Sequence, residues 1–315
     1  MPPVTPEAVA LFRYPLFFQY YYQKHSLDFN AAKLDALGVY ELVSSYFLEK
    51  IYHSSLAAEK IRLLHSLVTQ ASLHQGNFSA RKLTVLEDLK KFSQAYNELI
   101  SLGFLREVNL SREGVYAEYI EFPHKRLLAY SLAGKLVYEN NELYNEAVAY
   151  KLTALPEELR VPVLKWCVFN SVKAGQLTFF NCLAHIPLAA MDKTTIIDFL
   201  GNLLQHQSWL TQETGLQGAA IGRQPDLVAY FLGPAYLSAD YGRALESCLT
   251  LQPEGISKAW LYTALAMNNL VLFNSAGVEN CLHELRQVPA EAFGSLPLSP
   301  LDCLETIYSY LKYGT

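Results

Sequence analysis

The side chain with the clearest potential for chemistry is His124, which ends the segment Phe122-Pro123-His124. An imidazole ring can accept a hydrogen bond at one nitrogen and donate one at the other. The remaining histidines stand singly, and no H-E-x-x-H, G-x-S-x-G or paired-cysteine zinc pattern occurs. The sequence therefore predicts no catalytic residues and no metal site, and it predicts that this chain alone is not an enzyme.

The residues around His124 predict the elements that position it. Residues 92–102 carry the apolar stripe of a helix that ends at Gly103, and residues 115–122 alternate as a strand should. A turn at 109–114 joins the strands, and another helix begins after His124. With an earlier helix near residues 61–68, this order predicts a winged helix over residues 57–140. His124 would then lie where the hairpin leads into the last helix.

Ser79 provides a local signal inside this region. It precedes residues 80–89, which read as a helix, and serine is a favoured N-cap residue. The sequence therefore predicts that Ser79 caps a helix at this point.

Two helical regions flank the winged helix. Residues 1–56 contain a crowded aromatic run in which Pro15 starts or kinks a helix, and they predict a small helical subdomain. Residues 141–315 read as helical segments separated by proline and glycine, with a tetratricopeptide-like pattern at 237–253. The predicted fold class is mainly α, with a helical subdomain and a winged helix followed by an α-solenoid of degenerate tetratricopeptide-like or HEAT-like repeats.

Composition narrows the class of protein. The chain has 315 residues, a net charge of −5 and 51% hydrophobic residues, so nothing global favours nucleic acid or an anionic membrane. The five cysteines include no C-x-x-C pair, which predicts buried free thiols in a reducing, cytoplasmic compartment. Uncharged runs at 174–191 and 259–278 contain several polar residues, and they indicate buried repeat helices rather than membrane spans.

Three segments together resemble a known family. Residues 122–133 resemble the end of the winged helix in STAND-class signalling NTPases, closest to the NACHT-type branch. Residues 95–107 resemble the helix and strand that precede it there, and Arg13-Tyr14-Pro15-Leu16 resembles the segment that starts the family's lid subdomain. The resemblance covers about residues 10–140, and it assigns residues 1–56 to a lid-like role.

The resemblance implies roles for two residues. In that family the lid proline packs near the adenine of a bound nucleotide, and the winged-helix histidine reaches the β-phosphate of ADP. These nucleotide-sensing roles fall on Pro15 and His124, while Ala129 stands where the family usually has an acidic residue. Simpler alternatives remain open: His124 can merely cap the following helix or satisfy a backbone group, and Pro15 can be a helix-start proline.

A phosphate-binding loop is missing from the sequence. The pattern G-x-x-x-x-G-K-[ST] does not occur, because the only Gly-Lys pair, Gly134-Lys135, is followed by leucine and lacks the first glycine. We therefore expect no cofactor in this chain and place ADP or ATP in a nucleotide-binding domain of the same or another chain. The chain would then be the regulatory, sensing C-terminal part of a STAND-type NTPase.

The helical repeats are expected to bind a trigger or a partner protein, because stacked helix pairs present an extended surface. The candidate surface residues are Trp209, Tyr230, Tyr236, Tyr241 and Tyr262. The alternative for these side chains is ordinary packing between helices.

Two rival functions remain. The first is a free-standing helical-repeat scaffold whose winged helix binds only protein. The second is a DNA-binding regulator, but residues 92–102 contain no Lys or Arg and include Glu98, and Arg106 and Arg112 each stand beside a glutamate. Because phosphate contacts supply most DNA affinity, nucleic acid is not the expected partner.

Overall fold

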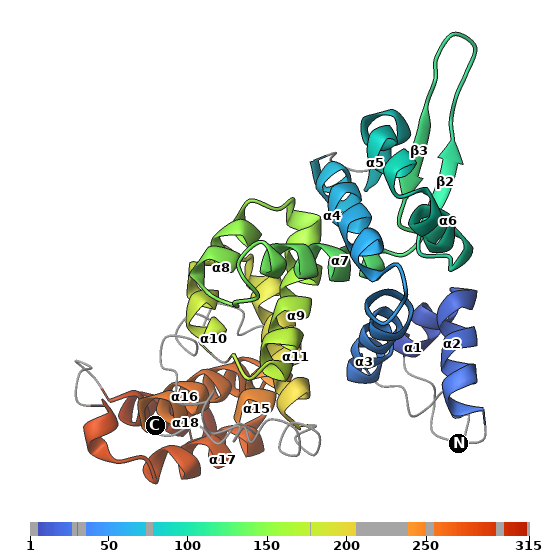
Figure 1. Ribbon diagram of the computed structural model, residues 1–315. Helices are drawn as coiled ribbons and strands as arrows, with labels where there is room; N and C mark the ends of the chain where they lie inside the picture. Colours follow the sequence, from blue (N-terminus) through green and yellow to red (C-terminus); the bar gives the residue numbers. More distant parts are fainter. Residues whose placement is uncertain are drawn as a thin grey trace. The chain divides into compact units, whose positions relative to one another are not determined.

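Figure 1 shows a computed structural model of the chain, which is mainly helical with one small three-stranded sheet. The mainly α part of the predicted fold class is therefore confirmed. The described residues are 6–26, 30, 36–73, 78–176, 178–205, 239–249, 255–293 and 299–313. They form two compact units, Met1–Glu142 with Ala154–Cys167, and Leu143–Thr153 with Val168–Thr315. No helix in the described ranges has both the length and the apolar character that crossing a membrane requires.

The first unit combines helices with the sheet. Its elements are α1 (Pro6–Phe12), α2 (Pro15–His25), α3 (Ala36–Phe47), the π-helix η2 (Leu48–Tyr52), α4 (Ala57–Leu73), β1 (Ser79–Arg81), the 3-10 helix η3 (Lys82–Val85), α5 (Leu86–Lys91), α6 (Ser93–Ser101), β2 (Arg106–Asn109), β3 (Glu118–Glu121), α7 (Lys125–Tyr138) and the first part of α9 (Glu157–Lys173). This unit spans both predicted N-terminal domains and also takes in a segment after residue 153.

An aromatic core joins those two predicted domains. Tyr46 stacks on Phe104 with ring centroids 5.3 Å apart, and Phe47 meets Tyr130 at 3.9 Å. Trp166 of α9 meets Tyr130 edge to face at 4.7 Å. Because large aromatic side chains remove much apolar area from water, this core contributes strongly to holding the helices of residues 6–52 against the rest of the unit.

Polar contacts reinforce the same junction. Lys60 of α4 is only 2% exposed, and its Nζ lies 2.7 Å from Glu98 Oε2 of α6 and donates to the Lys50 carbonyl at 3.1 Å. The Tyr46 hydroxyl donates to the carbonyl of Leu102 at 3.0 Å. A buried ammonium needs such partners, because desolvation of an unpaired charge is costly.

The sheet has the order β1-β3-β2, with both pairs antiparallel. Ser79 lies in β1 and pairs with Glu121 of β3, so the predicted helix cap at Ser79 is wrong. The backbone of residues 79–81 finds hydrogen-bond partners in β3, and helical structure starts only at Lys82. Ser79 thus forms part of a strand and not a helix cap, because it pairs with a strand about forty residues later in the chain.

The β2–β3 hairpin extends beyond the helices of the first unit (Figure 1). It closes through a bridge between Arg112 and Val115, and Gly114 adopts a φ of 74°. Glycine takes this left-handed conformation without the steric penalty of a side chain, which suits the tight turn at the tip.

The second unit is helical throughout its described part. Its elements are α8 (Glu146–Thr153), the last part of α9, α10 (Phe179–Cys182), the 3-10 helix η4 (Leu183–His185), α11 (Ala190–Gln205), α15 (Ala239–Leu249), α16 (Gly255–Val271), α17 (Ser275–Arg286), the 3-10 helix η5 (Ala290–Phe293) and α18 (Pro300–Tyr313). From α11 onward each of these α-helices packs against the next described one.

Close backbone approach marks the packing of α15, α16 and α17. A Cβ atom added at Gly242 would lie 2.3 Å from Asn268 Oδ1, and one added at Gly277 would lie 2.5 Å from Asn269 Oδ1. Both asparagines belong to α16 and are at most 7% exposed. The two glycines therefore let the neighbouring helices approach buried amide groups more closely than any other residue allows.

Candidate functional site

His124 occupies the junction between the hairpin and α7. Strand β3 ends at Glu121, and His124 follows it as the N-cap residue of α7 with an extended backbone. Its Nδ1 accepts a hydrogen bond from the backbone N–H of Arg126 at 2.9 Å. An accepting Nδ1 carries no proton, so the neutral ring carries its proton on Nε2. Nδ1 of His124 therefore caps α7, as the simpler alternative for this residue expects. Nε2 remains a hydrogen-bond donor.

The His124 ring packs against two aromatic side chains near the start of the chain, Tyr14 and Phe17. Its centroid lies 4.3 Å from that of Tyr14 and 5.6 Å from that of Phe17, both edge to face. Burial, reinforced by the nearby Arg126 charge, lowers the pKa of His124 to about 4. At neutral pH the ring is therefore uncharged and presents a fixed N–H rather than an imidazolium.

Pro15 lies beside this aromatic contact. It is the first residue of α2, directly after Tyr14, and it is exposed. Locally, Pro15 is therefore a helix-start proline, which is the simpler alternative for this residue. The tertiary structure nevertheless brings the Tyr14–Pro15 segment next to His124, although the two are far apart in the sequence.

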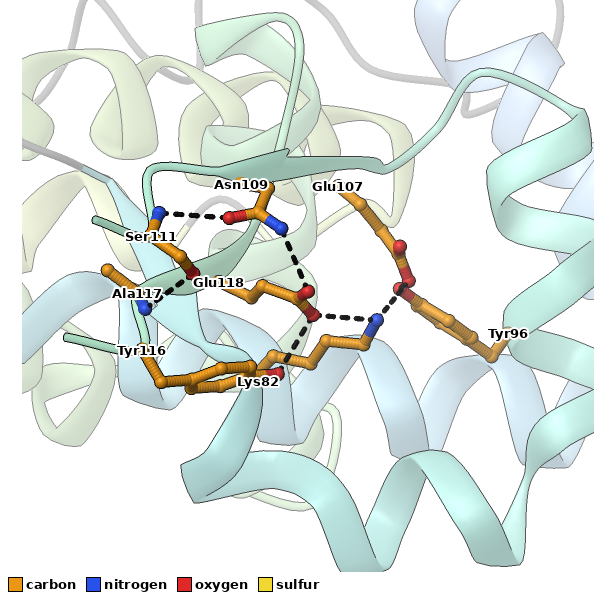
Figure 2. Close-up of polar contacts among 8 residues, drawn as sticks. All are labelled: Lys82, Tyr96, Glu107, Asn109, Ser111, Tyr116, Ala117 and Glu118. Atoms are coloured by element: carbon orange, nitrogen blue, oxygen red, sulfur yellow. Dashed lines mark hydrogen bonds and ion pairs between the residues drawn. The ribbon is translucent and has the colours of Figure 1, made fainter. Parts of the chain in front are cut away.

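A polar network on the hairpin was not anticipated from the sequence (Figure 2). Lys82 Nζ lies 2.9 Å from Glu107 Oε1 and 3.2 Å from Glu118 Oε2. The Tyr96 hydroxyl donates to Glu107, and the Tyr116 hydroxyl donates to Glu118 at 2.8 Å. These contacts connect η3, α6 and both strands, so they set the orientation of the hairpin on the unit.

Electrostatics in this network follow from the hydrogen bonds. The hydrogen bond from Tyr96 makes the largest contribution to lowering the pKa of Glu107, and the hydrogen bond from Lys82 makes the next largest. The bond to Glu107 raises the pKa of Lys82, against the smaller effect of burial. Glu107 is therefore ionised and Lys82 is charged at neutral pH, and the two charges offset each other.

The end of the hairpin nearer the turn is stabilised in the same manner. The Asn109 amide donates to Glu118 at 3.0 Å, and its Oδ1 accepts from the Ser111 N–H at 2.9 Å. Ser111 in turn accepts at Oγ from the Ala117 N–H at 2.9 Å. Figure 2 shows these side chains continuing the network of Lys82 toward the turn.

The charge pairing bears on nucleic-acid binding. Lys82 faces two glutamates, and Arg106 forms an ion pair with Glu121 across the sheet. Cations already paired with carboxylates gain little from a phosphate. The charges of Lys82 and Arg106 are thus offset by neighbouring carboxylates.

The structure describes two of the five candidate surface residues of the repeat region, Tyr241 and Tyr262. Trp209, Tyr230 and Tyr236 lie outside the described residues. Tyr241 is 1% exposed, so its assignment to a binding surface is wrong, because the ring packs inside the second unit. Tyr262 is half-buried, with Lys258 Nζ 5.5 Å from its ring centroid.

One hollow in the first unit lies between α2 and the α3–η2 segment. It has a volume of about 390 Å³ and is lined by polar side chains that include Tyr20, Lys24 and Glu49. Tyr20 donates to Glu49 at 2.9 Å, and Lys24 donates to Ser45 at 3.2 Å. These four side chains are therefore hydrogen-bonded to one another in pairs across the hollow.

The described ranges also bear on metal binding and on the state of the thiols. These ranges contain no group of three or more His, Cys, Asp or Glu side chains placed to hold a metal ion. The four cysteine side chains that the structure describes, Cys167, Cys182, Cys281 and Cys303, are all free, and Cys167 and Cys281 are buried. Cys303 is exposed, so the prediction of buried thiols is wrong at that position.

Comparison of this chain with protein-family models, with curated proteins and with solved structures found no match.

Proposed function

We propose that the first unit contains a winged helix that controls a nucleotide-binding domain, as in the STAND-class NTPases that the sequence resembles. The order α4, β1, α5, α6, β2, β3 and the sheet order β1-β3-β2 support the winged-helix assignment. In this proposal the helices of the second unit form the solenoid that binds a trigger or partner protein. ADP and ATP belong to a nucleotide-binding domain of the same or another chain.

The observation that carries the proposal is the geometry of His124. Its Nδ1 is used by the helix cap, which leaves Nε2–H as a donor, and its ring is held by Tyr14 beside Pro15. A neutral imidazole N–H held in one orientation can donate to a phosphate oxygen without first reorganising. The two residues assigned to nucleotide sensing by resemblance thus lie in the same region of the fold.

The proposed mechanism is a switch between two states. With ADP bound, Nε2–H of His124 donates to a phosphate oxygen and joins the winged helix to the nucleotide-binding domain. Exchange for ATP disturbs that hydrogen bond and releases the domains to rearrange. This chain lacks the phosphate-binding loop, so it contributes the sensing group and not the phosphate cradle.

The test separates capping from phosphate binding. Aspartate is a good N-cap residue, so His124→Asp keeps the acceptor for the Arg126 N–H but removes the donor and adds a negative charge. The protein is purified natively from its own cells through a tag on this chain, and the nucleotide released by denaturation is quantified by chromatography. We expect about one ADP per wild-type chain and at least a tenfold loss in His124→Asp, because repulsion between charges replaces a hydrogen bond.

Two controls complete this experiment. His124→Asn keeps the cap without the charge, and it should retain more ADP than His124→Asp does. The chain expressed by itself should bind no nucleotide tightly. Equal ADP retention by the wild type and His124→Asp would remove His124 from the mechanism, and the absence of nucleotide from the wild-type protein would contradict the proposal as a whole.

A free-standing helical-repeat scaffold is the second candidate function. Exposed apolar side chains on the second unit favour it, among them Phe273 at 89% and Tyr310 at 65% exposure. The same purification distinguishes it, because a scaffold would carry no ADP.

A further inference from the structure

The turn after α16 places a phenylalanine where glycine is preferred. The Phe273 N–H donates to the Leu270 carbonyl at 3.1 Å, and the Asn274 N–H donates to the Asn269 carbonyl at 2.8 Å. This pair of bonds is the Schellman motif, in which the residue at the position of Phe273 adopts a left-handed backbone. Its φ is 55°, a conformation that strains a bulky residue and that glycine adopts freely.

The Phe273 side chain gains nothing from burial that would offset this strain. It is 89% exposed, more than any other large apolar side chain among the described residues. Phenylalanine at this position is therefore unfavourable for the isolated fold in two independent ways. Strain retained in this manner is common where a residue serves binding.

A groove lies beside the same turn, between it and α18. Its volume is about 150 Å³, and its apolar walls include Leu270, Val278, Tyr308 and Leu311, with Phe273 at its side. An apolar cavity of about this volume holds a benzene ring. A projecting phenyl ring and a space that fits a phenyl ring thus occur on one surface.

The groove carries no unbalanced charge. Lys312 forms an ion pair with Glu279, and the Tyr308 hydroxyl donates to the same carboxylate at 2.7 Å. A partner recognised by its charge would need an unpaired charge here. A neutral rim instead allows two identical surfaces to meet without repulsion.

Helix α18 extends the apolar surface away from the groove. Ile307 is 43% exposed and Leu311 is 58% exposed, and residues four apart lie on one face of a helix. Exposed apolar side chains that continue from a groove mark an interaction site more reliably than isolated ones do.

We propose that this surface, formed by the turn after α16 and by α18, joins two copies of the chain about a two-fold axis. The Phe273 ring of each copy enters the groove of the other. A surface that contains both the projecting ring and the matching space is self-complementary, which is the property that a two-fold interface requires. This inference does not depend on the proposed nucleotide switch.

Sedimentation velocity of the full chain from about 1 to 500 µM tests the proposal. We expect a reversible monomer–dimer equilibrium for the wild type. Phe273→Gly should raise the dimer dissociation constant at least tenfold, while its melting temperature stays equal or rises because glycine relieves the backbone strain. The combination of weaker association and undiminished stability separates docking from a role in folding.

A second variant and a matched control make the result decisive. Leu311→Lys places a charge on the exposed wall of the groove and should also weaken the dimer at least tenfold. Tyr150→Ala removes another aromatic side chain of the second unit that is 76% exposed, and it should leave the dimer unchanged. A wild type that stays monomeric throughout, or a dimer that either Phe273→Gly or Leu311→Lys fails to weaken, overturns the proposal.

Discussion

The His124 ring fixes the start of α7 through one nitrogen and keeps a hydrogen-bond donor at the other. Its Nδ1 caps α7, and this bond leaves the proton on Nε2. The rings of Tyr14 and Phe17 hold the imidazole in an environment that disfavours charge. A single side chain can therefore fix a helix start and still offer one oriented donor.

Protonation of His124 should destabilise the first unit. The ordinary pKa of histidine is about 6.5, and the folded-state pKa of His124 is about 4. Between these values the unfolded chain binds more protons than the folded chain, so stability falls as the pH decreases through this window. We expect His124 to account for a loss of about 2 kcal/mol between pH 7.5 and pH 4.5, a figure reduced because the ring is only partly buried.

Chemical denaturation of the wild type and His124→Asn at both pH values measures this loss. Asparagine can cap the helix but does not titrate, so the difference between the two proteins isolates His124 from other groups such as His65, whose pKa burial also lowers. A difference in unfolding free energy that is the same at pH 7.5 and pH 4.5 would show that the ring is not kept neutral.

The helices of the second unit are positioned by small residues facing buried amides. Asn269 is 7% exposed, and its Oδ1 accepts from Asn274 Nδ2 at 2.8 Å. Gly277 lies against the same amide. Because this side chain is bonded and enclosed, it has little room to move aside, and the spacing of α16 and α17 depends on the missing Cβ.

Gly277→Ala should therefore destabilise the second unit. The new Cβ would lie 2.5 Å from Asn269 Oδ1, and overpacking of this kind costs about 1–3 kcal/mol. Thermal unfolding of the variant should show a lower melting temperature than the wild type. Combining it with Asn269→Ala should cost less than the sum of the single changes, because the second substitution removes the clash.

A glycine without such a neighbour serves as the contrast. At Gly134 in α7 the nearest atom to an added Cβ is Tyr52 Oη at 3.7 Å, an ordinary contact. Gly134→Ala should be neutral or should stabilise by up to about 1 kcal/mol, since alanine favours the helix. Equal destabilisation by both substitutions would refute the role assigned to the close approach at Gly277.

The charges of the molecule bear on its affinity for polyanions. The net charge is −5, and Lys82 of η3 and Arg106 of β2 face glutamates. Helix α6, which would enter the major groove of DNA in a DNA-binding winged helix, contains no Lys or Arg.

The chain should accordingly show no affinity for duplex DNA. We expect no binding to a fluorescent duplex at protein concentrations up to about 10 µM and at physiological salt, because few phosphates would be neutralised. Fluorescence anisotropy measures this directly. Micromolar binding that weakens steeply with added salt would instead favour the DNA-binding regulator.

Several parts of the fold followed from the sequence because they depend on neighbours in the chain. Ala95, Tyr96 and Leu99 are buried, as the apolar stripe predicted within residues 92–102 requires. Gly103 has a φ of 70°, as its role in ending a helix requires, and Pro15 begins α2. Such features come from side-chain spacing and from allowed backbone angles, both of which can be read locally.

Other features depended on residues that meet only after folding. Strand β1 formed at Ser79 because β3 provided its backbone partners, and Tyr241 was buried because helices enclosed it. The ion pair of Lys60 with Glu98 and the contact of Tyr14 with His124 likewise join distant segments. The sequence by itself thus determined that the chain is mainly helical, that one helix begins at Pro15 and that another ends at Gly103. Only the tertiary structure decided what the His124 side chain touches, because contacts between distant segments are set by packing rather than by local preference.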